Sequence, residues 1–362
     1  MILRIYILIA LCISSNLYAQ RQNKIDSLKK ELANSKMDHN KLNVLHQLWN
    51  ESINNNIDNA LIYSEEMITL GNALRIDTII GLGLEKKAVT YSYLNKFDSS
   101  NAYFNRALKI HTKLNDYKKI AGIERNIGQD HNMLGRLDSA YYYYDLAGKN
   151  YAKANDNIGI ADIYNSKAIV YLMKGYFNLA LENALKAEKI YSKNNLSMDL
   201  NQNRLVIASV YGQMKDTINA LTYHKKILKF FDEQNQKRQY ASSLYLILSL
   251  QIPDKEKEKE NKSLLEEFIN LSKTLKDKSL IDDALDNKAS LLKVSKKYNE
   301  AKTIYLNLIE NDLNINDTYS LAYNNKKLGE ILIHLKNYNS AIKYLEASKT
   351  YTEETNLEAL KP

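Results

Sequence analysis

The chain has 362 residues and a formal net charge of +8, from 50 basic and 42 acidic side chains that are spread along its length, which argues against a nucleic-acid-binding patch. Two prolines and 11 glycines, against ordinary usages of about 5% and 7%, exclude turn-rich β-sandwiches, β-barrels and glycine-rich nucleotide-binding folds. With 45% hydrophobic and 25% charged residues, the chain is not a disordered one, and we expect an all-α, soluble protein.

Residues 1–19 have the order of a secretory signal peptide. Arg4 is the only charge, an apolar stretch from Ile5 to Ile13 follows it, and small and polar residues lead to Ala19. The apolar stretch is too short to span a bilayer, which needs about 20 residues. We therefore expect cleavage after Ala19 and an exported, periplasmic protein. We expect no transmembrane segment once the signal is removed.

The chain has one cysteine, Cys12, and it lies inside this signal segment. A lipoprotein signal would place a small residue just before the cysteine, whereas Leu11 stands there. Lipid anchoring at Cys12 is thus the disfavoured alternative to ordinary cleavage. After ordinary cleavage the mature chain would have no disulfide and no thiol chemistry.

Small residues recur at a fixed interval of 40 residues through most of the remaining chain. One series is Ala60, Ser100, Ala140, Ala180, Ala220, Ala301 and Ala341, with Asn261 in the place of the missing member. The second series is Ala88, Gly128, Ala168, Ala208, Ser249, Ala289 and Gly329. Its single step of 41 places one inserted residue between Ala208 and Ser249.

Each series marks a place where two helices cross closely, so that only a small side chain fits. The apolar residues around them have helical spacing, and short turns such as Leu134-Gly135-Arg136 separate the helices. Each unit is thus a helix-turn-helix that buries its apolar face only by stacking on its neighbours, as in a solenoid. We expect a helical lead-in at 20–39, eight units over 40–355 and a tail at 356–362. The unit around 240–276 is degenerate.

The turn motifs Gly135–Ala140 and Gly175–Ala180 match a glycine, an aromatic or leucine two residues later, and an alanine three further on. Looser copies occur at Lys296–Ala301 and Lys336–Ala341. In these motifs the chain resembles the tetratricopeptide repeat (TPR) family over roughly residues 40–355. The resemblance implies an all-α, right-handed superhelical solenoid of about eight TPR-like units. Their 40-residue length exceeds the usual length of about 34 and is similar to that in kinesin light chains and bacterial peptide-sensing regulators.

The N-terminal region narrows this resemblance. A signal peptide, then Asp26–Leu32, then Lys41–Trp49 is similar to the exported sensor region of Bacteroidota signalling proteins. In those proteins the repeats usually continue into a transmembrane helix and a histidine kinase or helix-turn-helix output domain. Up to Pro362 this sequence contains no such segment, so we expect no output activity from it.

The sequence shows no motif for catalysis or for a cofactor. The six histidines have no metal-ligand spacing, and His131 and His224 fall at packing positions. Gly81-Leu82-Gly83 follows no strand, so it does not indicate a dinucleotide site. Of the four consecutive tyrosines 141–144, only Tyr144 stands at a core position. We expect no catalytic residue, no metal and no cofactor.

The resemblance places candidate binding residues on the concave face, which the first helix of each unit lines. They stand three residues before, and one and four after, each small residue of the second series. A peptide or protein partner would lie in this groove, where an asparagine often clamps the peptide backbone, and Asn165 is the best match. The candidates are Glu85, Val89, Ser92, Arg125, Gln129, Asn132, Asn165, Ile169, Leu172, Leu205, Ser209 and Gly212.

A second candidate contact surface is the end of the last helix, about Tyr338–Glu354. We expect Leu345, Ser348 and Tyr351 to form an exposed apolar stripe there. Such a stripe would support self-association or the docking of a partner.

These observations favour a non-catalytic scaffold that binds a protein or peptide, as the sensing part of a bacterial signal-transduction system. The first alternative is a periplasmic or outer-membrane assembly or nutrient-uptake accessory protein, because such proteins of the same bacteria also carry TPR repeats. An enzyme is the least favoured class, since no unit departs from the repeat enough to house a catalytic site.

Overall fold

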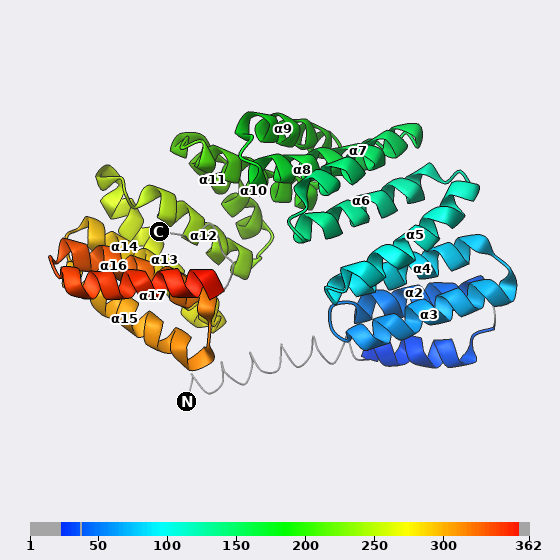
Figure 1. Ribbon diagram of the computed structural model, residues 1–362, viewed down its shortest axis with the longest axis horizontal. Helices are drawn as coiled ribbons and strands as arrows, with labels where there is room; N and C mark the ends of the chain where they lie inside the picture. The colour runs from blue at the N-terminus through cyan, green and yellow to red at the C-terminus, as the bar shows by residue number, and fades with distance from the viewer. Residues whose placement is uncertain (1–22, 37, 355–362) are drawn as a thin grey trace. The chain divides into compact units, whose positions relative to one another are not determined.

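The computed structural model describes residues 23–36 and 38–354, and Figure 1 shows these residues as successive helices. Within these ranges the chain is helical and contains no β-strand. The predicted signal peptide with Cys12, and the predicted tail 356–362, lie outside the described residues. Residues 23–34 are helical, and Leu28 of this segment is buried in a core that it shares with Val44 and Leu48.

The remaining helices have nearly uniform length. They are α2 (His39–Ser52), α3 (Ile57–Leu74), α4 (Asp77–Tyr93), α5 (Phe97–Lys113), α6 (Tyr117–Met133), α7 (Leu137–Lys153), α8 (Asn157–Met173), α9 (Phe177–Lys193), α10 (Ser197–Gln213), α11 (Thr217–Glu233), α12 (Lys237–Gln251), the 3-10 helix η1 (Lys255–Lys257), α13 (Glu258–Leu275), α14 (Lys278–Val294), α15 (Tyr298–Ile315), α16 (Thr318–His334) and α17 (Tyr338–Glu354).

Within α2 to α9, and again within α10 to α17, each helix packs against the next one in the chain, so that α2 to α17 form eight helix pairs within the described residues. This confirms the predicted all-α solenoid of helix-turn-helix units. The pairs fall into two compact units. The first unit contains α2 to α9 and ends at Leu196, and the second contains α10 to α17 and begins at Ser197.

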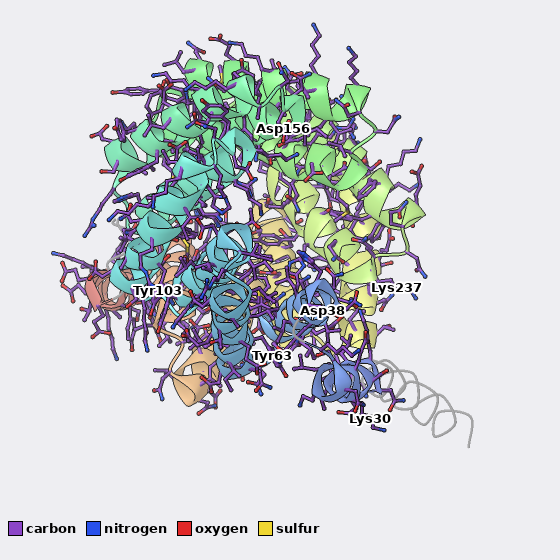
Figure 2. All side chains as sticks on the ribbon, turned by 90° about the vertical axis from the view of Figure 1, so that its right-hand side faces the viewer. Lys30, Asp38, Tyr63, Tyr103, Asp156 and Lys237 are labelled. Carbon is purple, nitrogen blue, oxygen red and sulfur yellow. The ribbon has the colours of Figure 1, made fainter. Side chains whose placement is uncertain are left out.

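The turns between helices repeat one local structure about every 20 residues. After most helices one residue adopts a left-handed backbone conformation, with a φ of 55° at Asn115 and 68° at Gly135. Asparagine and glycine tolerate this conformation better than other residues do. An aspartate then caps several of the following helices: Asp38 caps α2, and the side chain of Asp156 accepts a hydrogen bond from the backbone N–H of Gly159 in α8. Figure 2 labels both aspartates.

The small residues lie where the helices cross, as the period predicts. A Cβ atom added to Gly128 would come within 2.7 Å of the Tyr144 ring, so α6 and α7 approach each other at this glycine. Ser249, however, is exposed, whereas Leu248 before it is fully buried. The predicted position of the inserted residue is therefore wrong. The 40-residue register continues from Ala208 to Leu248, and the insertion follows in the turn after α12.

This insertion falls in the degenerate unit. α12 ends at Gln251, two residues before Pro253, and the short helix η1 follows before α13 begins. Asn261 replaces the small residue of the first series and is fully buried, with its Nδ2 donating to the carbonyl oxygen of Gln251 at 3.1 Å. The pair α12–α13 thus accommodates a polar side chain at a crossing where other pairs have alanine or serine.

The predicted apolar stripe on the last helix is not exposed. Ser348 is 3% exposed, and its hydroxyl donates to the carbonyl oxygen of Ala322 in α16 at 2.7 Å. Leu345 packs on Gly329, and Tyr351 packs against the core of the last pairs. The prediction of an exposed stripe is wrong because these residues form the face of α17 that covers α16. The apolar residues that α17 does expose are Tyr338 and Ile342.

Candidate functional site

The candidate site lies on the first helices of the pairs in the first unit. α4 contacts α6, and α6 contacts α8, in addition to the contacts that each makes with its own partner helix. We call the surface formed by α4, α6 and α8 the inner face. Two cavities open on it, and both have walls from α4 and α6.

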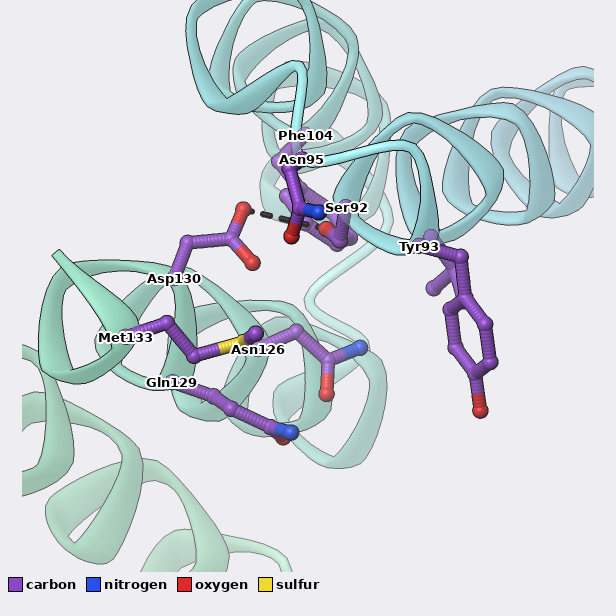
Figure 3. Close-up of a pocket in the computed structure, with 9 residues that line it drawn as sticks. Ser92, Tyr93, Asn95, Phe104, Asn126, Gln129, Asp130 and Met133 are labelled. Carbon is purple, nitrogen blue, oxygen red and sulfur yellow. Dashed lines mark hydrogen bonds between the residues drawn. The ribbon is translucent and has the colours of Figure 1, made fainter. Parts of the chain in front are cut away.

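The first cavity lies between the C-terminal ends of α4 and α6 and encloses about 400 Å³. Figure 3 shows its lining, and we call it the Asp130 cavity. Of its large apolar side chains, Tyr93 and Met133 are exposed, at 58% and 57%, whereas Phe104 of α5 is fully buried. The complete lining is Val89, Ser92, Tyr93, Asn95, Phe104, Asn126, Gln129, Asp130 and Met133.

Asp130 is the only charged residue among the described residues that line this cavity. Its side chain is 2% exposed, and its Oδ2 accepts hydrogen bonds from the hydroxyls of Ser100, at 2.7 Å, and Ser92, at 3.1 Å. Burial raises the pKa of the Asp130 carboxyl, and the two hydroxyl donors offset this rise only in part. The carboxylate is thus held in place but has no cationic partner in the cavity lining.

The second cavity lies toward the N-terminal ends of α4, α6 and α8 and encloses about 460 Å³. We call it the Arg125 cavity. Unlike the first cavity, it is lined by charges of both signs. Its lining is Glu85, Asp116, Lys118, Lys119, Gly122, Arg125, Tyr151, Asp156, Ile158, Gly159 and Asp162.

The charges of the Arg125 cavity are paired across neighbouring helices. Lys119 of α6 lies 3.2 Å from Glu85 of α4, and Nη1 of Arg125 donates to Asp162 of α8 at 2.7 Å. Asp162 also accepts a hydrogen bond from the hydroxyl of Tyr191 at 2.8 Å. These partly exposed pairs align three consecutive first helices and leave polar atoms at the surface that can exchange partners with a ligand.

The structure brings five of the predicted groove residues to these cavities. Val89, Ser92 and Gln129 line the Asp130 cavity, and Glu85 and Arg125 line the Arg125 cavity. Glu85 and Val89 of α4 lie one turn apart, as do Arg125 and Gln129 of α6, so both helices contribute predicted residues to both cavities. Asn132 lies on α6, and among the described residues no hydrogen-bond partner reaches its buried Oδ1 atom.

The other predicted groove residues lie outside the two cavities. Asn165, Ile169 and Leu172 are half-buried on α8. Leu205 and Ser209 belong to α10 in the second unit, where the Ser209 hydroxyl donates to the carbonyl oxygen of Leu205 at 2.8 Å. Their role in binding stays a prediction.

Sequence reasoning missed most of the Asp130 cavity, including Tyr93, Asn126, Asp130 and Met133. One signal was available for Asp130. The corresponding positions of other repeats hold buried uncharged side chains, for example Val170 and Val210, so a carboxylate stands out when the repeats are aligned. A search for motifs within one repeat does not reveal Asp130, because the residues that line the cavity come from two repeats.

The described residues contain no group of three or more histidine, cysteine, aspartate or glutamate side chains that could hold a metal ion. In the same part of the chain, no helix is long and apolar enough to cross a bilayer. His224 is buried on α11, where burial lowers its pKa, and the ring of His131 stacks on Tyr143 with centroids 5.3 Å apart. Both histidines thus serve in packing.

No protein-family model matches the chain, and no curated protein sequence matches it either. Solved structures do match. The apo form of the quorum sensor NprR from B. thuringiensis is 14% identical, with 93% of this chain and 95% of that chain covered and a TM-score of 0.66. Aspartyl phosphate phosphatase F from Bacillus subtilis is 14% identical, with 94% and 95% covered and a TM-score of 0.62.

A third match is the Rap conjugation gene regulator of the plasmid pLS20, whose structure is in complex with the Phr* peptide. It is 12% identical, with 92% of this chain and 95% of that chain covered and a TM-score of 0.54. At such identities these likenesses concern the fold. The chain therefore has the fold of the tetratricopeptide repeat proteins, as its repeat motifs predicted.

Proposed function

We propose that the protein is a non-catalytic scaffold that binds an extended peptide, or an extended segment of a partner protein, on the inner face of its first unit. The observation that carries the proposal is the pair of cavities that share α4 and α6 as walls. A peptide lying across these helices would reach apolar and amide groups in the Asp130 cavity and paired charges in the Arg125 cavity.

The structural neighbours support this proposal by analogy. One is named a quorum sensor, and another is a regulator in complex with a peptide. Because one fold can serve several functions, the proposal rests on the geometry of the inner face. The polar groups of the inner face come from single turns of neighbouring helices, which suits the recognition of a chain that crosses them.

The finer role that we propose is that of the sensing part of a bacterial signal-transduction system, in an exported protein. The order of charge, apolar stretch and small residues in 1–19 supports export. Sequencing of the native protein would begin at Gln20 if the signal is removed after Ala19. Recovery of intact Met1 from the cytoplasm would contradict export but leave the binding proposal unaffected.

Selection of random 12-residue peptides on the full chain tests the binding function. We expect the selected peptides to bind the Arg125→Gln variant about tenfold more weakly than the unmodified chain, because this change removes the charge that links α6 to α8. Lys109→Gln is the matched control, since Lys109 is exposed on α5 and its loss should leave the affinity unchanged. Equal affinity in all three proteins, or no selected peptide, would contradict the proposal.

A further inference from the structure

Two departures from the repeat pattern meet in the Asp130 cavity. At the position of Asp130, one other repeat has the half-buried Leu250, and five others bury an uncharged side chain: Thr90, Val170, Val210, Leu291 and Ile331. Ser100 occupies a position where one other repeat buries Asn261 and six bury alanine: Ala60, Ala140, Ala180, Ala220, Ala301 and Ala341. The only hydroxyl in the alanine series therefore donates to the only carboxylate in the uncharged series, at 2.7 Å.

The fold itself does not require this carboxylate. Four of these five buried positions hold valine, leucine or isoleucine, and their helices form the same kind of pair. A buried carboxylate without a cationic partner costs free energy, since burial disfavours its charged form. Burial raises the pKa of Asp130 accordingly. A costly group that the repeat does not need is typical of a functional site.

The geometry leaves one side of the carboxylate directed at the cavity. Both serine hydroxyls donate to Oδ2. Figure 3 shows the other oxygen pointing into the space lined by Asn126 and Gln129. The side-chain amides of these two residues, with that of Asn95, provide further hydrogen-bond acceptors around the same space.

We propose that the Asp130 cavity binds the positively charged side chain of a lysine or arginine of the peptide ligand. This inference rests on the proposed peptide-binding function and names the residue type that this cavity selects. The cation would pair with Asp130, and its aliphatic stem would lie against Val89, Tyr93 and Met133. The exposed ring of Tyr93 and the flexible Met133 suit such a stem and its charged end.

Small probes test the inference without a peptide. N-acetyl-argininamide and N-acetyl-lysinamide carry the charge, whereas N-acetyl-citrullinamide and N-acetyl-norleucinamide are their neutral counterparts. The readout is the methyl NMR signal of Met133 in the full chain with labelled methionines, assigned with Met133→Leu. We expect a saturable shift of this signal with the two cations and no saturable shift with the neutral probes.

Asp130→Asn should weaken the binding of the cations by about tenfold or more, because the amide keeps the size of the side chain but not its charge. Asp98→Asn is the matched control. It removes one negative charge from an exposed position on α5 and should leave the affinity unchanged. Unchanged signals from the other methionines establish that the variants are folded. The comparison of charged with neutral probes uses the unmodified protein, so it tests the inference even if a variant fails to fold.

The inference is overturned if neutral and charged probes shift Met133 equally, if Asp130→Asn binds the cations as well as the unmodified chain does, or if no probe shifts Met133. Its failure is distinguishable from that of the proposed function. Selected peptides that bind the inner face with no preference for lysine or arginine would contradict this inference alone.

Discussion

At the scale of single residues, the burial of the Asp130 carboxylate places a charge in a cavity and lowers the stability of the fold. Its position in the repeat suits an aliphatic side chain, as Val170 and Val210 show. Two serine hydroxyls orient the carboxylate, but neutral donors do not replace the water that a charged group loses on burial. Its contribution to stability should therefore depend on pH.

We predict that Asp130→Asn stabilises the protein by about 1 to 2 kcal/mol at pH 7. Because burial raises the pKa of Asp130 in the folded state, the group stabilises the fold most when it is protonated, below its unfolded pKa of about 3.9. That contribution is lost as the pH rises through the folded pKa. The advantage of the variant should thus grow from pH 3.5 to pH 7.

Urea denaturation at the two pH values measures this difference. Asp98→Asn, at an exposed position, should change the stability by less than about 0.5 kcal/mol at either pH. A variant at Asp130 that is less stable than the unmodified protein at pH 7 would show that the carboxylate contributes to the fold.

At the scale of helices, close crossings depend on glycine where the partner is a large ring. A Cβ on Gly128 would lie 2.7 Å from two ring atoms of Tyr144, which is buried and has no room to move. Gly122, on the same helix, has only the Tyr151 hydroxyl nearby, at 3.7 Å. The two glycines of α6 therefore separate the effect of packing from that of helix propensity.

We predict that Gly128→Ala destabilises the protein by about 1 to 3 kcal/mol because it overpacks the α6–α7 crossing. Gly122→Ala should instead be neutral or stabilise by up to about 1 kcal/mol, since alanine favours the helix. Thermal and urea denaturation of both variants check this. Equal effects would mean that the α6–α7 crossing has room for a methyl group.

We also predict that the pair α12–α13 opens before the pairs α6 to α9. Asn261 takes the place of a small residue there and is fully buried, and among the described residues no hydrogen-bond partner reaches its Oδ1. Buried polar atoms without partners are costly, and repeat proteins are held by interfaces between neighbours. Amides of 240–276 should exchange faster than those of 128–190. Uniform protection would contradict this.

At the scale of the whole molecule, the two cavities of the inner face belong to the first unit. We predict that a selected peptide slows amide exchange in α4, α6 and α8 and leaves α12 to α17 unchanged, because a ligand stabilises the segments that it contacts. Hydrogen exchange with and without the peptide measures this. Protection confined to the second unit would place the site elsewhere.

The sequence was sufficient to locate part of the site. Five predicted residues line the cavities because they stand at fixed distances from a small residue at a helix crossing: Glu85, Val89, Ser92, Arg125 and Gln129. The repeat spacing also explains why the predicted exposed stripe on α17 is wrong. Leu345 stands at the repeat position of Phe104 and Tyr144, which pack within their own helix pairs, so the repeat alignment already indicated an inward side chain.

The sequence by itself determined the helices, their pairing and the turns between them. These depend on local preferences and on one 40-residue period, both of which can be read along a single chain. Only the tertiary structure decided which polar groups share a cavity. Ser100 and Asp130 are 30 residues apart and belong to different helix pairs, and they meet because the crossing of α4, α5 and α6 directs their side chains to one point.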